Sequence, residues 1–282
     1  PSSWGGSISP DGARVAFLSD RGGHPQAWVQ PLGDPRGARL VELGPDPVAG
    51  VRWSSDGQWL ACAVAPCGGV MTHVWAVRPD GSGARRLAGE AGEHVAMGPW
   101  THHGAHLAVA ELAESPGAGD AWELVDPATA TRRPLISGQR VVVLDLSSTE
   151  RFALLRRGPR GARSALVLDR ALDRPQPLLP FSRSGSTETG MLRPPPERRS
   201  AAQDDAAVAY LLSDSGWPRA CLLAVGVRAD GSRGPVGMLA GREDADLELV
   251  AIDDAGRTAV LAWNRDGRSE VELLDLRTGG RS

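Results

Sequence analysis

Three closely spaced histidines are the residues whose types best suit metal chemistry. His102, His103 and His106 lie in one short stretch, and His94 lies upstream. Neutral imidazole is a common metal ligand, but this spacing matches no zinc-site pattern, and no Asp, Glu or Cys stands within the cluster. Two of the three histidines fall in an expected hairpin turn, where their side chains would face solvent. We therefore expect no metal site here.

Aspartate–glycine pairs recur along the chain, for example at Asp11, Asp56 and Asp80. A calcium loop needs oxygen ligands in an Asp-x-Asp-x-Asp-Gly pattern, which the sequence lacks. Asp-Gly is instead typical of tight turns, because Asp bonds to nearby backbone N–H groups and Gly takes a positive φ without steric cost. We interpret these aspartates as turn formers. The sequence also lacks a phosphate-binding glycine loop, a dinucleotide fingerprint and a paired-cysteine motif, so it predicts no cofactor.

Composition argues against two classes of function and suggests a compartment. The 31 basic and 34 acidic residues give a net charge of −3, which disfavours nucleic-acid or membrane binding as the main role. No apolar run approaches the ~18 residues of a membrane helix. The cysteines, Cys62, Cys67 and Cys221, are too few for a disulfide framework, so we expect a cytoplasmic protein with buried thiols. A Cys62–Cys67 bridge across a short loop is the alternative.

A repeat organises the chain. Turn markers stand at positions 11, 56, 103, 149, 204 and 255, spaced by 45, 47, 46, 55 and 51 residues, and each precedes a short apolar run. These runs are rich in Val, Leu, Ala and Trp and too short for an average helix, so they predict strands. A period of about 40–50 residues built from short strands is the signature of propeller blades. The sequence therefore predicts an all-β fold, a β-propeller of four-stranded antiparallel blades.

We expect six blades in a single propeller domain over residues 1–282. Their ranges are 5–45, 46–92, 93–138, 139–180, 201–243 and 244–282. Residues 181–200, rich in Pro and Ser, are expected to form an irregular connection. The sixth blade lacks its fourth strand, and the residues around Gly5 and Gly6 are poor candidates to supply one. Because the chain starts at Pro1 and stops within a blade, we expect a segment of a longer polypeptide that continues past Ser282.

Tryptophan recurs within the repeat. Trp28, Trp75 and Trp122 occupy the same position on the third strand of three successive repeats, and Trp53 and Trp100 match each other at the end of the first strand. Equivalent positions predict packing between blades. Stacking on carbohydrate or nucleic-acid bases would instead place tryptophans in irregular loops.

One face of the expected blades carries the longer loops. In an up-and-down blade, the loop between the second and third strands lies on the face opposite the tight Asp-Gly turn. The arginines in or beside these loops that we expect to bind are Arg21, Arg156, Arg157, Arg219, Arg265 and Arg268. A mildly basic face would attract the carboxylate end of a peptide or dock a partner domain. A solvated rim without a binding role is an equally open alternative.

The first repeat resembles a known family. Its turn, Ser9-Pro10-Asp11-Gly12, and the residues 15–23 that follow resemble the propeller repeats shared by TolB and the prolyl oligopeptidase family of serine peptidases. Residues 26–32, 74–81 and 269–276 are similar to actinobacterial, acylaminoacyl-peptidase-like members of that family. The resemblance spans essentially the whole chain and departs from the family pattern at the third, fourth and fifth turns. It implies a seven-bladed ring, six blades of which are visible, that caps an α/β-hydrolase domain of the same polypeptide.

The residues limit what this resemblance implies about function. The serine nucleophile of such a hydrolase sits in a Gly-x-Ser-x-Gly turn, and no Ser in this chain has Gly at both positions. We therefore assign no catalytic residue and expect the α/β-hydrolase domain to lie outside this chain. The expected function is to gate short or acylated peptides for that domain. The alternative is a stand-alone TolB-like propeller, periplasmic or secreted, that binds a protein partner.

Overall fold

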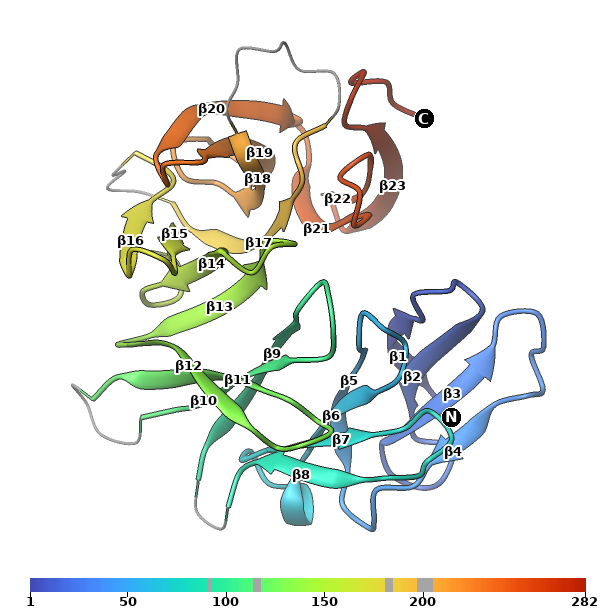
Figure 1. The fold of residues 1–282 in the computed structure, drawn as a ribbon. Helices are drawn as coiled ribbons and strands as arrows, with labels where there is room; N and C mark the ends of the chain where they lie inside the picture. The colour runs from blue at the N-terminus through green and yellow to red at the C-terminus, as the bar shows by residue number, and fades with distance from the viewer. Residues whose placement is uncertain (91–92, 114–117, 181–184, 197–204) are drawn as a thin grey trace. The chain divides into compact units, whose positions relative to one another are not determined.

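The computed structural model describes residues 1–90, 93–113, 118–180, 185–196 and 205–282. Within these ranges, the regular elements are β-strands and one 3-10 turn at Pro66–Gly68, and no helix is long and apolar enough to cross a membrane. The chain divides into two compact units, Pro1–Gln139 and Arg140–Ser282, each with three antiparallel sheets (Figure 1). Each sheet consists of strands that are consecutive in the sequence, which is the topology of a propeller blade.

The N-terminal unit contains blades one to three. Blade one consists of β1 (Ser3–Ile8), β2 (Arg14–Ser19), β3 (Gln26–Pro31) and β4 (Arg39–Val41). Blade two consists of β5 (Val48–Trp53), β6 (Leu60–Val64), β7 (His73–Val77) and β8 (Arg85–Ala88). Blade three consists of β9 (Val95–Trp100), β10 (Leu107–Glu111), β11 (Asp120–Val125) and β12 (Arg132–Gly138).

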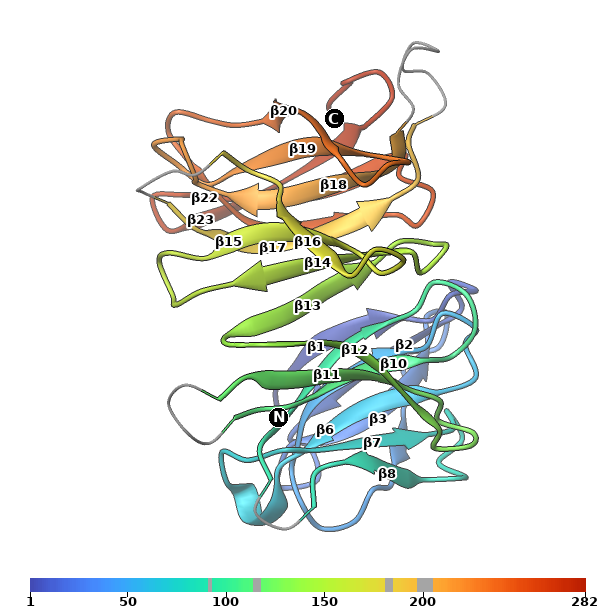
Figure 2. The same cartoon turned by 60° about the vertical axis from the view of Figure 1, so that its left-hand side comes forward.

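The C-terminal unit contains blades four to six (Figure 2). Blade four consists of β13 (Val141–Leu146), β14 (Phe152–Arg157), β15 (Ser164–Asp169) and β16 (Arg174–Pro177). Blade five consists of β17 (Thr187–Arg193), β18 (Asp205–Ser213), β19 (Cys221–Arg228) and β20 (Arg233–Ala240). Blade six has only β21 (Asp246–Ile252), β22 (Thr258–Arg265) and β23 (Arg268–Asp275).

The prediction that blade six lacks its fourth strand is confirmed for the chain described. Its sheet has three strands, and a fourth is only begun, by a bridge between Leu274 and Arg281. Beside that bridge, Leu273 and Ser282 exchange two backbone hydrogen bonds of 2.8 and 3.0 Å. The other blades are four-stranded, as the sequence predicted.

The aspartates of the repeat form turns, as predicted. The Asp11 carboxylate accepts the Ala13 N–H at 3.0 Å, and Asp56 accepts the Gln58 N–H at the same distance. The glycine after each aspartate, such as Gly12, has a φ of +68°, in the left-handed region that a side chain disfavours. These short turns fix the register of the first two strands in their blades.

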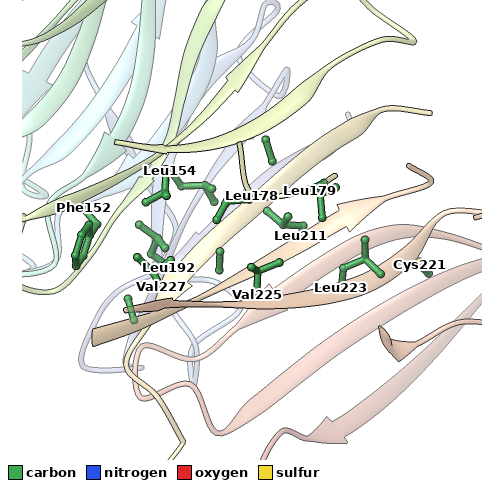
Figure 3. Packing of buried hydrophobic residues seen from close by; sticks show 14 residues of the cluster. Phe152, Leu154, Leu178, Leu179, Leu192, Leu211, Cys221, Leu223, Val225 and Val227 are labelled. Carbon is green, nitrogen blue, oxygen red and sulfur yellow. The ribbon is translucent and has the colours of Figure 1, made fainter. Parts of the chain in front are cut away.

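Apolar side chains fill the space between consecutive blades of each unit. Between blades four and five, Phe152 and Leu154 of β14 meet Leu211 of β18 and Val225 of β19 (Figure 3). Similar clusters lie between blades one and two, two and three, and five and six. Every blade thus contributes alternate residues of its strands to a core shared with a neighbour.

The expected irregular connection over residues 181–200 is wrong for its central part. Residues Thr187–Arg193 form β17, the first strand of blade five, which therefore starts before the predicted boundary at 201. Gly190 lies where Leu154, Tyr210 and Leu211 leave no room for a side chain, so this strand lacks a clear apolar alternation. Residues 181–184 and 197–200 of the expected connection lie outside the described residues.

The expectation that Gly5 and Gly6 are poor strand residues is also wrong. Both belong to β1, the first strand of blade one. The register shifts between Trp4 and Ser7, and Gly5 has a φ of +63°, so the glycines accommodate a bulge in this strand.

Candidate binding surfaces

The arginines predicted to bind divide between the two units. Arg21 belongs to the N-terminal unit. The other predicted residues, Arg156, Arg157, Arg219, Arg265 and Arg268, belong to the C-terminal unit. They come from the ends of second strands, from the loops that lead to third strands and, for Arg268, from the first position of the third strand β23. Their hydrogen bonds and ion pairs distinguish those that are engaged from those that are free to meet a ligand.

Arg21 is held against aromatic rings of its own blade. Its guanidinium lies 4.6 Å from the ring centre of Trp28 and 5.3 Å from that of Phe17. Its Nε donates to Ser19 Oγ at 3.2 Å. This stacking orients the guanidinium and leaves its remaining N–H groups for a carboxylate.

Arg219 and Arg265 are already engaged by acids of blade six and the connection before it. Arg219 Nη1 lies 2.8 Å from Asp246 Oδ2, and its Nε donates to the carbonyl of Glu243 at 2.7 Å. Arg265 Nε lies 3.0 Å from Asp244 Oδ2. Exposed pairs of this kind are weak and exchange partners readily.

Arg156 and Arg157 end β14 and differ in environment. Arg156 is half-buried, and its Nη1 donates to the carbonyl of Glu188. Its pKa lies below the ordinary value because burial disfavours the charge and because the Arg163 guanidinium is near. Arg163 is in turn paired with the Glu188 carboxylate. Arg157 is exposed and, like Arg268, has no ion pair with any described residue.

Arg157 also takes part in a groove at the outer edge of the C-terminal unit. The groove has a volume of about 1020 Å³, and its charged lining residues are Arg157, Arg163, Arg174 and Arg233. Arg174 begins β16 of blade four, and Arg233 begins β20 of blade five (Figure 1). No carboxylate belongs to the described residues that line it. We call this feature the basic groove.

Sequence reasoning missed Arg174 and Arg233 because it considered only the loops between second and third strands. A repeated signal was nevertheless present. Every fourth strand begins with an arginine: Arg39, Arg85, Arg132, Arg174 and Arg233. In the N-terminal unit two of these tie neighbouring blades together, since Arg85 Nη1 donates to the Ala128 carbonyl and Arg132 Nη2 to the Leu87 carbonyl.

The histidine stretch forms a turn. The backbone N–H of His106 donates to Thr101 Oγ1 at 3.3 Å, and the same hydroxyl donates to the His103 carbonyl at 3.0 Å. Across the described ranges, no three His, Cys, Asp or Glu side chains gather in a way that could hold a metal ion.

The cysteines are free thiols, so the alternative Cys62–Cys67 bridge is not formed. Burial raises the pKa of the Cys62 thiol to about 12. Burial, and then the nearby Asp214 carboxylate, raise the pKa of Cys221 to about 11. Both buried thiols are therefore unreactive apolar fillers at neutral pH.

No family model matches the sequence, and no curated protein matches it. Solved structures do match the fold. A prolyl endopeptidase is similar with a TM-score of 0.69 and 17% identity, over 99% of this chain and 41% of its own. The acylaminoacyl peptidase of Pyrococcus horikoshii gives 0.64 and 13%, over 96% and 43%. TolB of Acinetobacter baumannii gives 0.62 and 12%, over 96% and 63%.

This chain has the fold of the peptidase and TolB propellers. The resemblance read from the turns and strands of the sequence is thereby confirmed for the fold. The chain spans about two fifths of the length of the two peptidases, 41% and 43%. At these identities the likeness shows the architecture alone, and six blades are described in the chain.

Proposed function

We propose that this chain is the propeller part of a serine peptidase of the prolyl oligopeptidase or acylaminoacyl peptidase type. The observation that supports this proposal is the structural similarity, over nearly the whole chain, to peptidases more than twice as long. In this proposal an α/β-hydrolase domain of the same polypeptide supplies the catalytic serine. A seventh blade completes the ring, and the polypeptide works in the cytoplasm. The propeller admits short or acylated peptides and excludes folded proteins by size.

The long-loop arginines give this proposal its peptide contacts. Arg157 and Arg268 are exposed and have no ion pair within the described ranges, so they are the most available to an incoming C-terminal carboxylate. Arg21 presents an oriented guanidinium. Arg156 is anchored to the Glu188 carbonyl, and Arg219 and Arg265 bind a ligand only by exchanging their present acidic partners. A guanidinium binds a carboxylate through two parallel hydrogen bonds, which orients as well as attracts it.

Two measurements test the proposal. The purified chain should neither hydrolyse an acyl-amino-acid anilide nor react with an active-site serine probe. The polypeptide encoded by the whole gene should react with the probe at a serine outside residues 1–282, and its kcat/KM should fall as peptide substrates lengthen. Stoichiometric labelling of this chain, or equal rates for short and long peptides, would contradict the proposal.

The alternative is a TolB-like module that binds a protein partner outside the cytoplasm. Its support is the likeness to TolB, of which this chain covers 63%. Reading the gene on both sides of residues 1–282 separates the two. A secretion signal before Pro1 favours the module, whereas a downstream Gly-x-Ser-x-Gly segment favours the peptidase.

A further inference from the structure

The charges of the basic groove are not compensated within the described protein. Arg157, Arg174 and Arg233 are exposed, and none of them makes an ion pair with a described residue. Among the described residues that line the groove, only Arg163 makes an ion pair, with Glu188. A groove lined by uncompensated guanidinium groups raises the local concentration of anions and offers them paired hydrogen-bond donors.

The corresponding position in blade three behaves differently. Arg132, which begins β12 as Arg174 begins β16, lies 2.8 Å from Glu123 and also donates to the Leu87 carbonyl at 2.6 Å. Arg132 thus links blade three to blade two of the N-terminal unit. The fold therefore allows the arginine that begins a fourth strand to form an ion pair. Arg174 of blade four and Arg233 of blade five form none with a described residue.

The backbone edge of β16 adds a second recognition element. The Leu178 N–H donates to the Ala165 carbonyl of β15 at 2.9 Å, and Pro175 and Pro177 pair opposite Leu168 and Leu166. In an antiparallel strand, the backbone N–H and C=O groups of successive residues point alternately toward the partner strand and away from it. The carbonyls of Pro175 and Pro177 therefore face the outer edge, and proline has no N–H to place beside them.

This edge accepts hydrogen bonds and cannot supply the donors that ordinary strand addition needs. A ligand that matches the groove carries carboxylates for the arginines and N–H groups for the two proline carbonyls. An acidic peptide carries both. A nucleic-acid backbone has no N–H donor, and no aromatic side chain for stacking bases belongs to the described lining residues.

We propose that the basic groove binds an acidic peptide segment in an extended conformation. Carboxylates of the segment pair with Arg157, Arg174 and Arg233, and its backbone N–H groups donate to the outward carbonyls of β16. A volume of about 1020 Å³ is ample for several residues, since pockets for drug-sized ligands measure roughly 300–1,000 Å³. The groove shares Arg157 with the long-loop arginines of the proposed function, whereas Arg174 and Arg233 belong to the groove alone, so variants of these two residues test the groove separately.

The test is the binding of a fluorescein-labelled hexaglutamate peptide to the full chain, measured by fluorescence anisotropy at low salt. A double variant, Arg174→Glu with Arg233→Glu, should weaken binding by about tenfold or more, as the loss of ~1.4 kcal/mol implies. Arg39→Glu is the matched control, because Arg39 is also exposed and also begins an outer strand. It should leave the affinity within about twofold of the unmodified chain.

Further probes decide the chemical class. A hexaglutamine peptide should bind far more weakly than hexaglutamate, and a single-stranded oligodeoxynucleotide should not compete for the groove. Unchanged affinity in the double variant would overturn the site. Tight oligodeoxynucleotide binding that the same variant abolishes would overturn the assignment to a peptide. If the charge reversals unfold the chain, Arg174→Gln with Arg233→Gln removes the charges at constant shape and gives the same comparison.

Discussion

The guanidinium of Arg193 lies 2.7 Å from the carboxylate of Asp145, and both side chains are about nine-tenths buried. Asp145 belongs to β13 and also accepts the Leu192 N–H at 2.9 Å. Arg193 belongs to β17, and its Nε donates to the Asp253 carbonyl, just after β21, at 3.0 Å. One ion pair thus joins the first strands of blades four, five and six.

Replacing Arg193 should be severely destabilising. Arg193→Met leaves Asp145 buried without its counter-ion, and breaking a buried pair from one side costs about 3–5 kcal/mol. Urea unfolding followed by tryptophan fluorescence measures the loss. Arg219→Met is the control, because the Arg219–Asp246 pair is exposed on both sides and should contribute below about 1 kcal/mol. Equal losses in the two variants would show that the Arg193 pair is not buried as described.

Asp169 should make stability depend on pH in the acid range. Its carboxylate accepts Arg151 Nη2 at 2.8 Å and the Ala171 N–H at 3.0 Å. The hydrogen bond from Arg151 is the largest influence on its pKa, which lies below the ordinary value although burial opposes the shift. A depressed pKa in the folded state means that the stabilisation is complete above the unfolded value, about 3.9, and is lost as the pH falls below it.

Asp169→Asn should therefore lower the urea midpoint at pH 7 and flatten its further decline between about pH 4 and the lower folded-state pKa. The comparison needs unfolding curves of both proteins at neutral pH and at several acid values. A difference between the two proteins that stays constant over the whole range would show that the Asp169 carboxylate does not titrate differently in the fold.

The repeat in the sequence was sufficient to predict the blades whose first turns keep the Asp-Gly pattern. It also predicted blade four, whose first turn has Thr149-Glu150 in place of Asp-Gly. Glu150 stands where Gly12 stands in the first turn and has a φ of +57°, a conformation that glycine favours. The turn still forms, because the Glu150 N–H donates to the Ser147 carbonyl at 2.8 Å and Ser147 Oγ accepts the Phe152 N–H at 3.0 Å. Ser147 matches Ser9 of the first turn, so this serine, rather than Asp-Gly, was the more general marker.

The first strand of blade five could not be predicted in the same way. In Thr187–Arg193, a charged residue and a glycine occupy buried positions. Arg193 is buried because Asp145, remote in sequence, neutralises it. Gly190 is buried because two neighbouring side chains and a backbone carbonyl approach it. Such pairings across blades leave no local pattern. The same holds for the basic groove, which Arg174 of blade four and Arg233 of blade five line together only once the two blades have folded.

Gly190→Ala tests the close packing of β17. A Cβ added at Gly190 would lie 2.8 Å from the Tyr210 carbonyl oxygen and 2.9 Å from Leu154 Cδ2, so the strand or its neighbours must shift. Overpacking of this kind costs about 1–3 kcal/mol. Gly237→Ala is the matched control in the same blade, since nothing lies within 4 Å of its Cβ position. We expect Gly237→Ala to be neutral or slightly stabilising, and equal losses at the two sites would contradict the placement of β17.

The equivalent tryptophans should differ in their contribution to stability, although the sequence predicts one role for them. Trp122 is 2% exposed, and its ring lies 2.6 Å from where a Cβ on Gly98 would be. Trp75 is only partly buried against the core between blades one and two. Trp122→Ala should therefore cost about 3–5 kcal/mol, and Trp75→Ala about 1–3 kcal/mol, because less apolar surface returns to water. Trp217→Ala, at an exposed ring, is the control and should cost below about 1 kcal/mol. Urea unfolding of the three variants gives the order directly, and a loss at Trp75 as small as that at Trp217 would show that Trp75 does not pack between blades.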